Sequence, residues 1–200
     1  MRLILIRHAE TDGNKTHYVG RQDLPLNTAG RLQAAALAHA LAAEPIDCIL
    51  AGPLIRARDT AAAIADPRGL AVDIRDGLIE VDYGELQGTL KGEKPFKLRK
   101  RHLHQPMPGG ESLADVWGRL GAVAGTLRQQ LALGRTIVVV GHYWSNRLLL
   151  SLMSGVEFED AVARGAIKPA NASAYALDFR PADGALRPAE PLLLFTPGKS

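Results

Sequence analysis

The sequence has one cysteine, Cys48, and this scarcity excludes an internal disulfide. Cys48 stands beside Ile49 and Leu50 in a segment typical of a buried strand, so we expect no reactive thiol there. Long apolar runs are also missing: stretches such as 137–140 and 148–150 fall far short of the roughly 20 residues of a membrane helix. The amino terminus lacks a signal-peptide pattern. We therefore expect a cytoplasmic protein that contacts no membrane.

The sequence has no large excess of positive or negative charge. Lys and Arg number 24 against 21 Asp and Glu, and aromatic residues make up only 5% of the chain. A nucleic-acid interface would gather many more basic and aromatic side chains, so we expect no nucleic-acid partner. The small positive surplus suits a small anionic ligand. The densest basic run, 91–104, is either a solvated helix face or a rim that attracts a charged substrate.

The length of 200 residues is sufficient for one ordinary domain, and we expect a single domain covering 1–200. Apolar residues alternate between strand and helix spacing along most of the chain. Helices are predicted over 28–41, 53–64, 112–133 and 146–153, with Pro53 at a favoured first position. Strands are predicted over 3–6, 47–51, 71–74, 136–141, 173–179 and 192–195, and 77–88 is expected to be a functional loop.

This alternation predicts a three-layer α/β/α domain with a mainly parallel central sheet and right-handed crossovers. Arg7 and His8 follow the first predicted strand, and His142 follows the strand over 136–141. Ligand sites of open α/β sheets lie at the carboxyl ends of the strands, so we expect both histidines to face one crevice. A guanidinium group matches phosphate oxygens, and a neutral imidazole is a competent nucleophile. The pattern therefore indicates phosphoryl transfer.

Six motifs then occur in a characteristic order. They are segments 5–11 with Asn14, 20–27 with Gly30, 53–57 with Thr60, 78–80 with Tyr83 and Gly84, 108–112, and 138–142. Together they resemble the motifs of the histidine phosphatase superfamily, also called the phosphoglycerate mutase-like family, and the resemblance covers most of the chain. It implies the phosphoglycerate mutase-like fold.

The resemblance also implies roles for individual residues. His8 would attack phosphorus and become phosphohistidine, and Glu80 would protonate the leaving oxygen and later take a proton from water. Arg7, Arg56 and His142 would complete the catalytic set by holding the phosphoryl oxygens. No metal and no cofactor would be needed. The expected substrate-binding residues are Arg7, Asn14, Arg21, Arg56, His142 and Tyr143.

The chain departs from the family pattern after the second histidine. Tyr143 and Trp144 follow His142, where the family usually has one or two glycines, and a large ring there would form a wall of the pocket. Ala9 replaces a more usual glycine, and Gly52 replaces a serine. Four other histidines match no catalytic position, and they are His17, His39, His102 and His104. The spacing of the last two is weak evidence for a metal site.

We expect a metal-independent phosphatase that hydrolyses a small phosphorylated metabolite through phosphohistidine. The first alternative is a phosphoglycerate mutase, since 83–88 resembles the mutase loop, although the chain between Gly88 and Pro108 is shorter than in mutases. The second is a catalytically idle, phosphate-binding regulatory module on the same fold, for which Tyr143 is the best argument. Segment 89–112 is expected to form a cap or insertion over the site. A homodimer is left open.

Overall fold

This computed structural model describes residues 1–13, 16–91, 100–164, 167–182 and 185–198, within which seven strands form one sheet. The strand order is β3-β2-β4-β1-β5-β6, and β7 also pairs with β5. The first four strands of that order are parallel, whereas β5 runs antiparallel to β1, β6 and β7. The bounds are Arg2–Arg7 (β1), Cys48–Ala51 (β2), Val72–Ile74 (β3), Thr136–Gly141 (β4), Ala174–Ala182 (β5), Ala185–Pro188 (β6) and Leu192–Phe195 (β7).

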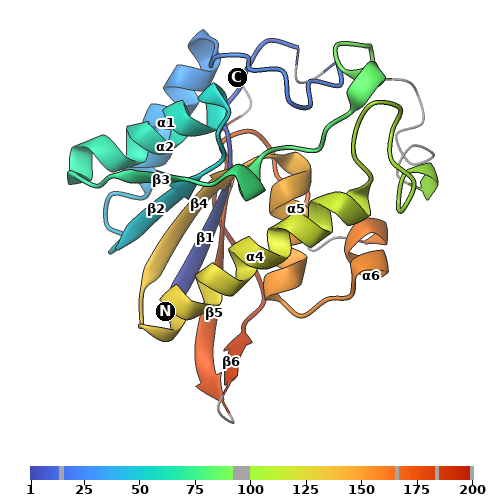
Figure 1. Ribbon diagram of the computed structural model, residues 1–200. Coiled ribbons are helices and arrows are strands. Elements are labelled where there is room, and N and C mark those ends of the chain that lie inside the picture. The colour runs from blue at the N-terminus through green and yellow to red at the C-terminus, as the bar shows by residue number, and fades with distance from the viewer. Residues whose placement is uncertain (14–15, 92–99, 165–166, 183–184, 199–200) are drawn as a thin grey trace.

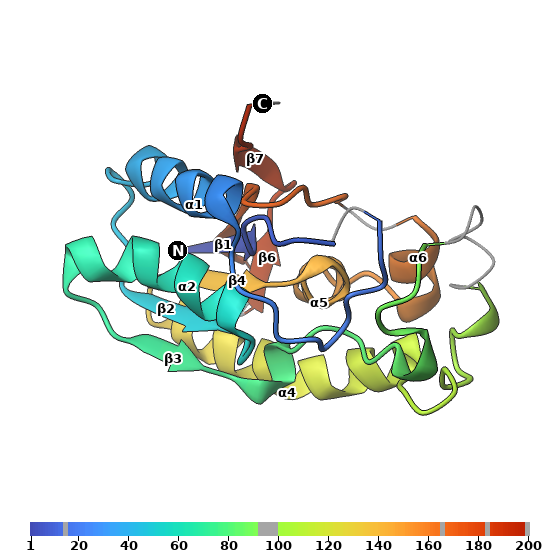
Figure 2. The same cartoon turned by 90° about the horizontal axis from the view of Figure 1, so that it is seen from above.

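Helices cover both faces of the sheet and complete three layers (Figures 1 and 2). The first layer holds α1 (Thr28–Ala40) and α2 (Ile55–Ala65). The opposite layer holds α4 (Leu113–Ala132) and α5 (Tyr143–Met153), with the short α6 (Phe158–Ala163) beside them. Short 3-10 turns lie at Asp66–Arg68 (η1), Asp76–Leu78 (η2) and Gly84–Leu86 (η3). Among the described ranges, no helix is both long and apolar enough to cross a bilayer.

Strand β1 is apolar on both faces because it is covered from both sides. Leu3 and Leu5 belong to the cluster formed with α4 and α5, whereas Ile4 and Ile6 belong to the cluster formed with α1 and α2. Successive side chains of a strand point to opposite faces, so a continuous apolar run is what a strand buried on both faces requires. Strand β4 repeats this alternation.

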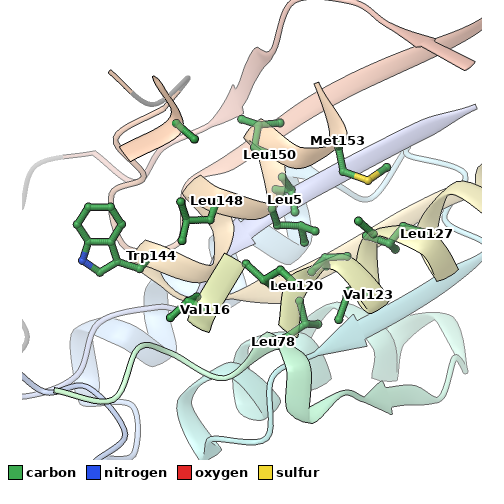
Figure 3. Packing of buried hydrophobic residues seen from close by; sticks show 14 of the residues in the cluster. Leu5, Leu78, Val116, Leu120, Val123, Leu127, Trp144, Leu148, Leu150 and Met153 are labelled. Carbon is green, nitrogen blue, oxygen red and sulfur yellow. The ribbon is translucent and has the colours of Figure 1, made fainter. Parts of the chain in front are cut away.

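Helix α4 packs one apolar stripe against α5 and the sheet. Its start is fixed by Ser112, whose side chain accepts the N–H of Asp115 while the Asp115 carboxylate accepts the N–H of Ser112. From there Val116, Leu120, Val123 and Leu127 follow at helical spacing. Figure 3 shows these side chains on the side that faces Leu148 of α5 and Leu5 of β1.

The predicted strands and the helix over 112–133 are confirmed, but two helix starts differ from the prediction. Helix α2 begins at Ile55 with extended Leu54 as its N-cap, so Pro53 precedes the helix. The Ile55 N–H is accepted by the carboxylate of Asp23, 2.7 Å away, in a distant loop. Helix α5 begins at Tyr143, directly after His142, and not at 146. Helix α6 and strand β6 were not predicted.

Segment 89–112 lies partly outside the described residues, because 92–99 are not described. Leu90 pairs with His17 in an isolated bridge, and the Lys91 N–H donates to the Thr16 carbonyl oxygen at 2.7 Å. At the other end, the His102 carbonyl oxygen accepts the N–H of Leu113 at 3.0 Å. The segment is therefore anchored beside the loop after β1 and at the start of α4. Its role as a cap stays a prediction.

Replacing Leu120 by alanine should destabilise the fold. Leu120 is fully buried between α4, α5 and the sheet, so Leu120→Ala should lower the free energy of unfolding by about 2–5 kcal/mol. Leu133, at the end of the same helix, is 69% exposed, and Leu133→Ala should cost less than about 0.5 kcal/mol. Urea denaturation of both variants measures the difference. Equal losses would contradict the packing described for α4.

Candidate active site

The parallel pairing of β1 with β4 brings two histidines together. Arg7 lies opposite Gly141 in the register, and the N–H of His8 donates to the Gly141 carbonyl oxygen at 2.9 Å. The residue that follows each of these two strands is therefore a histidine at the carboxyl edge of the sheet. The His8 and His142 rings have centroids 5.2 Å apart and planes inclined by 55°. Both strand-end histidines thus occupy one place, as the strand pattern predicts.

The hydrogen bond of His8 decides which ring nitrogen is free for chemistry. Its Nδ1 lies 2.7 Å from the carbonyl oxygen of Ala9, and the ring is 4% exposed. A carbonyl oxygen only accepts, so Nδ1 carries the proton of the neutral ring. The lone pair is therefore on Nε2. An imidazole held in this tautomer is oriented for nucleophilic attack through Nε2.

His142 is fully buried at the start of α5. Its N–H donates to Ser145 Oγ at 2.9 Å, while Nδ1 and Nε2 of its ring have no hydrogen-bond partner among the described residues. Gly52 makes room for this ring, because a Cβ at position 52 would lie 3.0 Å from His142 Nε2. The departure from serine at Gly52 therefore bears directly on the shape of the site.

Two arginines bring positive charge that is held by main-chain oxygens. Arg56 of α2 donates from Nη1 to Gln22 O at 2.6 Å and from Nη2 to Gly20 O at 2.7 Å. Arg7 donates from Nη1 to Pro169 O at 3.0 Å. Carbonyl oxygens fix these guanidinium groups without neutralising them. The Nε atoms of both arginines are buried without a partner among the described residues, which leaves donors for an anion.

Burial sets the charge state of the site. Burial lowers the pKa of His8 well below its ordinary value of 6.5, and the positive Arg56 and Arg7 lower it further. Burial also lowers the pKa of His142 well below 6.5, and Arg56 is the largest of the positive neighbours that lower it further. Burial also lowers the pKa of Arg56 to about 10, which leaves it protonated near neutral pH. The ligand-free site thus holds neutral imidazoles beside cationic guanidinium groups.

Glu80 places the site's carboxylate at the amino end of α5. Oε2 accepts the N–H of Tyr143 at 2.9 Å, and both carboxylate oxygens accept the N–H of Trp144 at 3.1 and 3.2 Å. Oε1 also accepts the N–H of Val81 at 3.0 Å. The N–H groups at the start of a helix favour a negative group there. The 7% exposed Glu80 is thereby held next to His142, which the helix follows.

The Tyr143 ring lies beside Arg7. The Arg7 guanidinium carbon lies 5.5 Å from the centroid of the Tyr143 ring, and that of Arg147 lies at the same distance from it. Arg147 Nη1 also donates to Tyr143 Oη at 3.3 Å. Because Tyr143 is the first residue of a regular helix, its main chain needs no glycine.

Two of the expected substrate-binding residues are not seen at the site: Arg21 contacts other residues, and Asn14 is not described. Arg21 donates from Nη2 to Glu111 Oε1 at 2.6 Å and from Nε to the Glu80 carbonyl oxygen at 3.3 Å, and Nη1 lies 3.4 Å from Asp82 Oδ2. These contacts hold Arg21 behind the Glu80 loop, and its contact with substrate stays a prediction. Asn14 lies outside the described residues.

Sequence reasoning gave no role to two residues, Thr60 and Arg147, that contact the main chain around the site. Thr60 Oγ1 accepts the N–H of Ala9 at 3.0 Å and donates to Arg56 O at 2.7 Å, which ties α2 to the turn after His8. Arg147, 1% exposed, donates to Ile167 O at 3.0 Å. Its spacing of four residues from Tyr143, in a helix with no other charged residue, was the available signal.

Three of the remaining histidines contact residues that are not among the expected site residues. His102 Nδ1 lies 3.1 Å from Gln105 O, His104 lies 3.5 Å from Glu159 Oε1, and His17 Nδ1 lies 2.8 Å from Thr16 Oγ1. Over the described ranges, no group of three His, Cys, Asp or Glu side chains could hold a metal ion.

Comparison with known proteins agrees with this geometry. The family model of the histidine phosphatase superfamily (branch 1) matches residues 3–188 of the sequence. The chain belongs to the histidine phosphatase superfamily. Phosphoserine phosphatase 1 of Hydrogenobacter thermophilus is 35% identical over 165 residues, 78% of each chain. The solved structure of mycobacterial glucosyl-3-phosphoglycerate phosphatase is 27% identical and superimposes with a TM-score of 0.79 over 96% of both chains.

A mutase is also among the relatives of this histidine phosphatase. The 2,3-bisphosphoglycerate-dependent phosphoglycerate mutase of Brucella anthropi is 32% identical over 168 residues, 77% of this chain and 82% of the relative. The expected fold, with phosphoglycerate mutase-like phosphatases as structural neighbours, is confirmed. Family membership and the phosphatase relatives together identify the chain as a phosphoric monoester hydrolase.

The lowered pKa of His142 predicts a pH dependence of stability. Below pH 6.5 the unfolded chain binds a proton that the folded, buried ring does not, so the free energy of unfolding should fall as the pH drops below 6.5. The slope is at most about 1.4 kcal/mol per pH unit for each such histidine. Above pH 6.5 both states are neutral at this position, and the contribution is constant.

Urea denaturation between pH 7.5 and 5.5, in buffers without phosphate, measures this slope. His142→Gln should reduce it, whereas His39→Gln, which alters an exposed histidine near the end of α1, should leave it unchanged. A slope that His142→Gln leaves as in wild type would contradict a neutral buried His142.

Proposed function

We propose that this chain is a metal-independent phosphatase that hydrolyses a small phosphomonoester through a phosphohistidine on His8. One observation carries the proposal: buried nitrogens of Arg7, Arg56 and His142 have no hydrogen-bond partner among the described residues, beside a neutral His8. Buried polar groups are nearly always satisfied, and a phosphoryl group supplies acceptor oxygens for the arginine N–H groups and for the single N–H of a neutral His142. The surrounding positive charge suits a dianion.

In the first half-reaction, His8 Nε2 attacks phosphorus and the bond from phosphorus to the ester oxygen breaks. Arg7, Arg56 and His142 donate hydrogen bonds to the phosphoryl oxygens and stabilise their charge. Asn14 and Tyr143 are expected to contribute further contacts to the same group. Glu80, in its protonated form, gives its proton to the leaving alkoxide, which departs as an alcohol.

In the second half-reaction, water attacks the phosphorus of phosphohistidine. The Glu80 carboxylate takes a proton from that water, the bond from phosphorus to Nε2 breaks, and inorganic phosphate leaves with His8 neutral again. The arginine side chains supply the positive charge that a metal ion would otherwise provide, so the proposed reaction needs no metal. The partner is a small phosphorylated metabolite.

Phosphoglycerate mutase is the second candidate, and the relative from Brucella anthropi favours it. A mutase would return the phosphoryl group from His8 to a phosphoglycerate, whereas a phosphatase gives it to water. Both reactions use the same nucleophile and the same positive groups. Only the fate of phosphohistidine distinguishes the two candidates.

His8→Ala should abolish the covalent intermediate. Rapid quenching of wild type with 32P-labelled phosphoserine or p-nitrophenyl phosphate, in EDTA, should yield a protein adduct that is labile to acid and stable to base. His8→Ala should form no adduct and lose at least about 10³-fold in turnover, because the nucleophile is gone. His39→Ala on the exposed face of α1 is the matched control. Turnover by His8→Ala near the wild-type rate, or loss of wild-type turnover in EDTA, would refute the mechanism.

Wild type should release phosphate from 3-phosphoglycerate at least about tenfold faster than it converts it to 2-phosphoglycerate, because water is the proposed acceptor. Parallel assays of phosphate and of isomer, with and without 2,3-bisphosphoglycerate as a primer, measure both rates. Faster interconversion would establish the mutase. Absence of any turnover across phosphoserine, phosphoglycerates, sugar phosphates and p-nitrophenyl phosphate would favour the idle module.

A further inference from the structure

Next to the main chain of Glu80 lies a cluster of charged side chains to which the reaction steps proposed above assign no role. It consists of Arg119 on α4, Glu111 just before that helix, and Arg21 from the loop after β1, and we call these three residues the brace. Their side chains are 18–31% exposed, so the charges lie largely out of water. Burying three charged groups is costly unless they are hydrogen bonded to one another or to the main chain.

Arg119 contacts the Glu80 loop at two main-chain oxygens. Its Nη1 donates to Gly77 O at 2.7 Å, and its Nη2 donates to Glu80 O at 3.2 Å. The same guanidinium is paired with Glu111, with Nε 3.2 Å from Oε1 and Nη2 3.3 Å from Oε2. One side chain of α4 therefore holds both ends of the short segment that leads into Glu80.

Arg21 holds the same carbonyl oxygen from another element. Its Nε donates to Glu80 O at 3.3 Å, so this one oxygen accepts from two guanidinium groups. Glu111 joins the two arginines, because Oε1 accepts from Arg21 at 2.6 Å and from Arg119. Glu111 Oε2 also accepts the N–H of Asp82 at 3.2 Å. The segment after Glu80 is thereby fixed as well.

We infer that Arg119, together with Glu111 and Arg21, positions Glu80 for proton transfer to the leaving group. The brace holds the main chain of Glu80 on one side while the carboxylate reaches the N–H groups of Tyr143 and Trp144 on the other. The carboxylate is thus held at the amino end of α5, which directly follows His142. This inference rests on the proposed function, since it gives the three residues a role through the proposed acid.

The neighbouring loops are held together without the brace. A Cβ on Gly84 would lie 2.0 Å from Pro108 O, and one on Gly110 would lie 2.4 Å from Asp82 O, so the two loops pack main chain against main chain. The N–H of Glu111 donates to Asp82 O at 3.0 Å. The side-chain contacts that the brace adds are those to Gly77, Glu80 and Asp82. A small displacement of a catalytic group is enough to slow a reaction by about 10²-fold.

Arg119→Gln should harm reactions in proportion to the basicity of the leaving group. Single-turnover phosphorylation of His8 is measured with three esters: p-nitrophenyl phosphate, phenyl phosphate and O-phosphoserine. In this order the leaving group becomes more basic and depends more strongly on protonation. We expect a loss of about 10- to 100-fold on O-phosphoserine and of less than about threefold on p-nitrophenyl phosphate. Glu80→Gln should show the same order of losses. Arg119→Lys, which keeps a charged donor, should recover part of the rate.

The matched control is Arg128→Gln on the same helix. Arg128 Nη2 donates to Leu152 O at 2.7 Å at an exposed position, and its loss should change no rate. Equal losses on all three esters in Arg119→Gln, or none, would overturn the inference. If Arg119→Gln melts below the assay temperature, Glu111→Gln takes its place, since it keeps the shape of the side chain and removes the charge that joins the two arginines.

Amide hydrogen exchange tests the inference without turnover. The N–H groups of Tyr143 and Trp144 are covered by Glu80, so Arg119→Gln should speed their exchange by about tenfold, as Glu80→Ala should, and Arg128→Gln should not. Unchanged exchange in Arg119→Gln would overturn the inference even if wild type hydrolyses none of the esters. That absence of hydrolysis would overturn the proposed function instead.

Discussion

The register between β1 and β4 is the constraint on which the site depends. Arg7 faces Gly141, and the hydrogen bond of 2.9 Å from His8 to Gly141 O continues the ladder by one residue beyond the strands. A slip of one residue would turn every side chain of β1 to the opposite face, so the buried alternation along the strand enforces this register. The packing of an apolar core thereby determines the separation of two histidine rings.

The second constraint is electrostatic, and burial outweighs the other influences on it. Positive neighbours and burial act in the same direction on His8, which keeps the imidazole neutral. For Arg7, burial lowers the pKa while Glu80 opposes it. The guanidinium groups are anchored by carbonyl oxygens, which hold a cation without cancelling its charge. Donors that are fixed before an anion arrives need no reorganisation, and such donors act more strongly in a dry site than in water.

Much of the fold could be predicted, because buried strands and long amphipathic helices leave strong patterns. Strand β4 and helix α4 are confirmed nearly residue for residue. Helix α5 was predicted to start too late, since Tyr143 and Trp144 break the apolar spacing, and its start depends on contacts with Ser145 and Glu80. Helix α6 has six residues, too few for a helical periodicity to be recognised, and strand β6 has the sequence Ala-Leu-Arg-Pro, which contains no apolar run.

The site divides in the same way. The motif order was enough to select His8 and Glu80, but the brace uses main-chain oxygens, and no sequence pattern records a contact between a side chain and a distant carbonyl oxygen. The relatives show that the shared fold does not determine the substrate. The structure that superimposes with a TM-score of 0.79 is a glucosyl-3-phosphoglycerate phosphatase, whereas the relative that is 35% identical is a phosphoserine phosphatase. In the proposed mechanism the phosphoryl group is held by residues at strand ends and helix starts, and this part of the site would be common to all substrates. Selection among substrates must then come from side chains around the phosphate-binding residues. In this chain Tyr143, whose ring lies against both Arg7 and Arg147, is the large side chain that we expect to influence this selection.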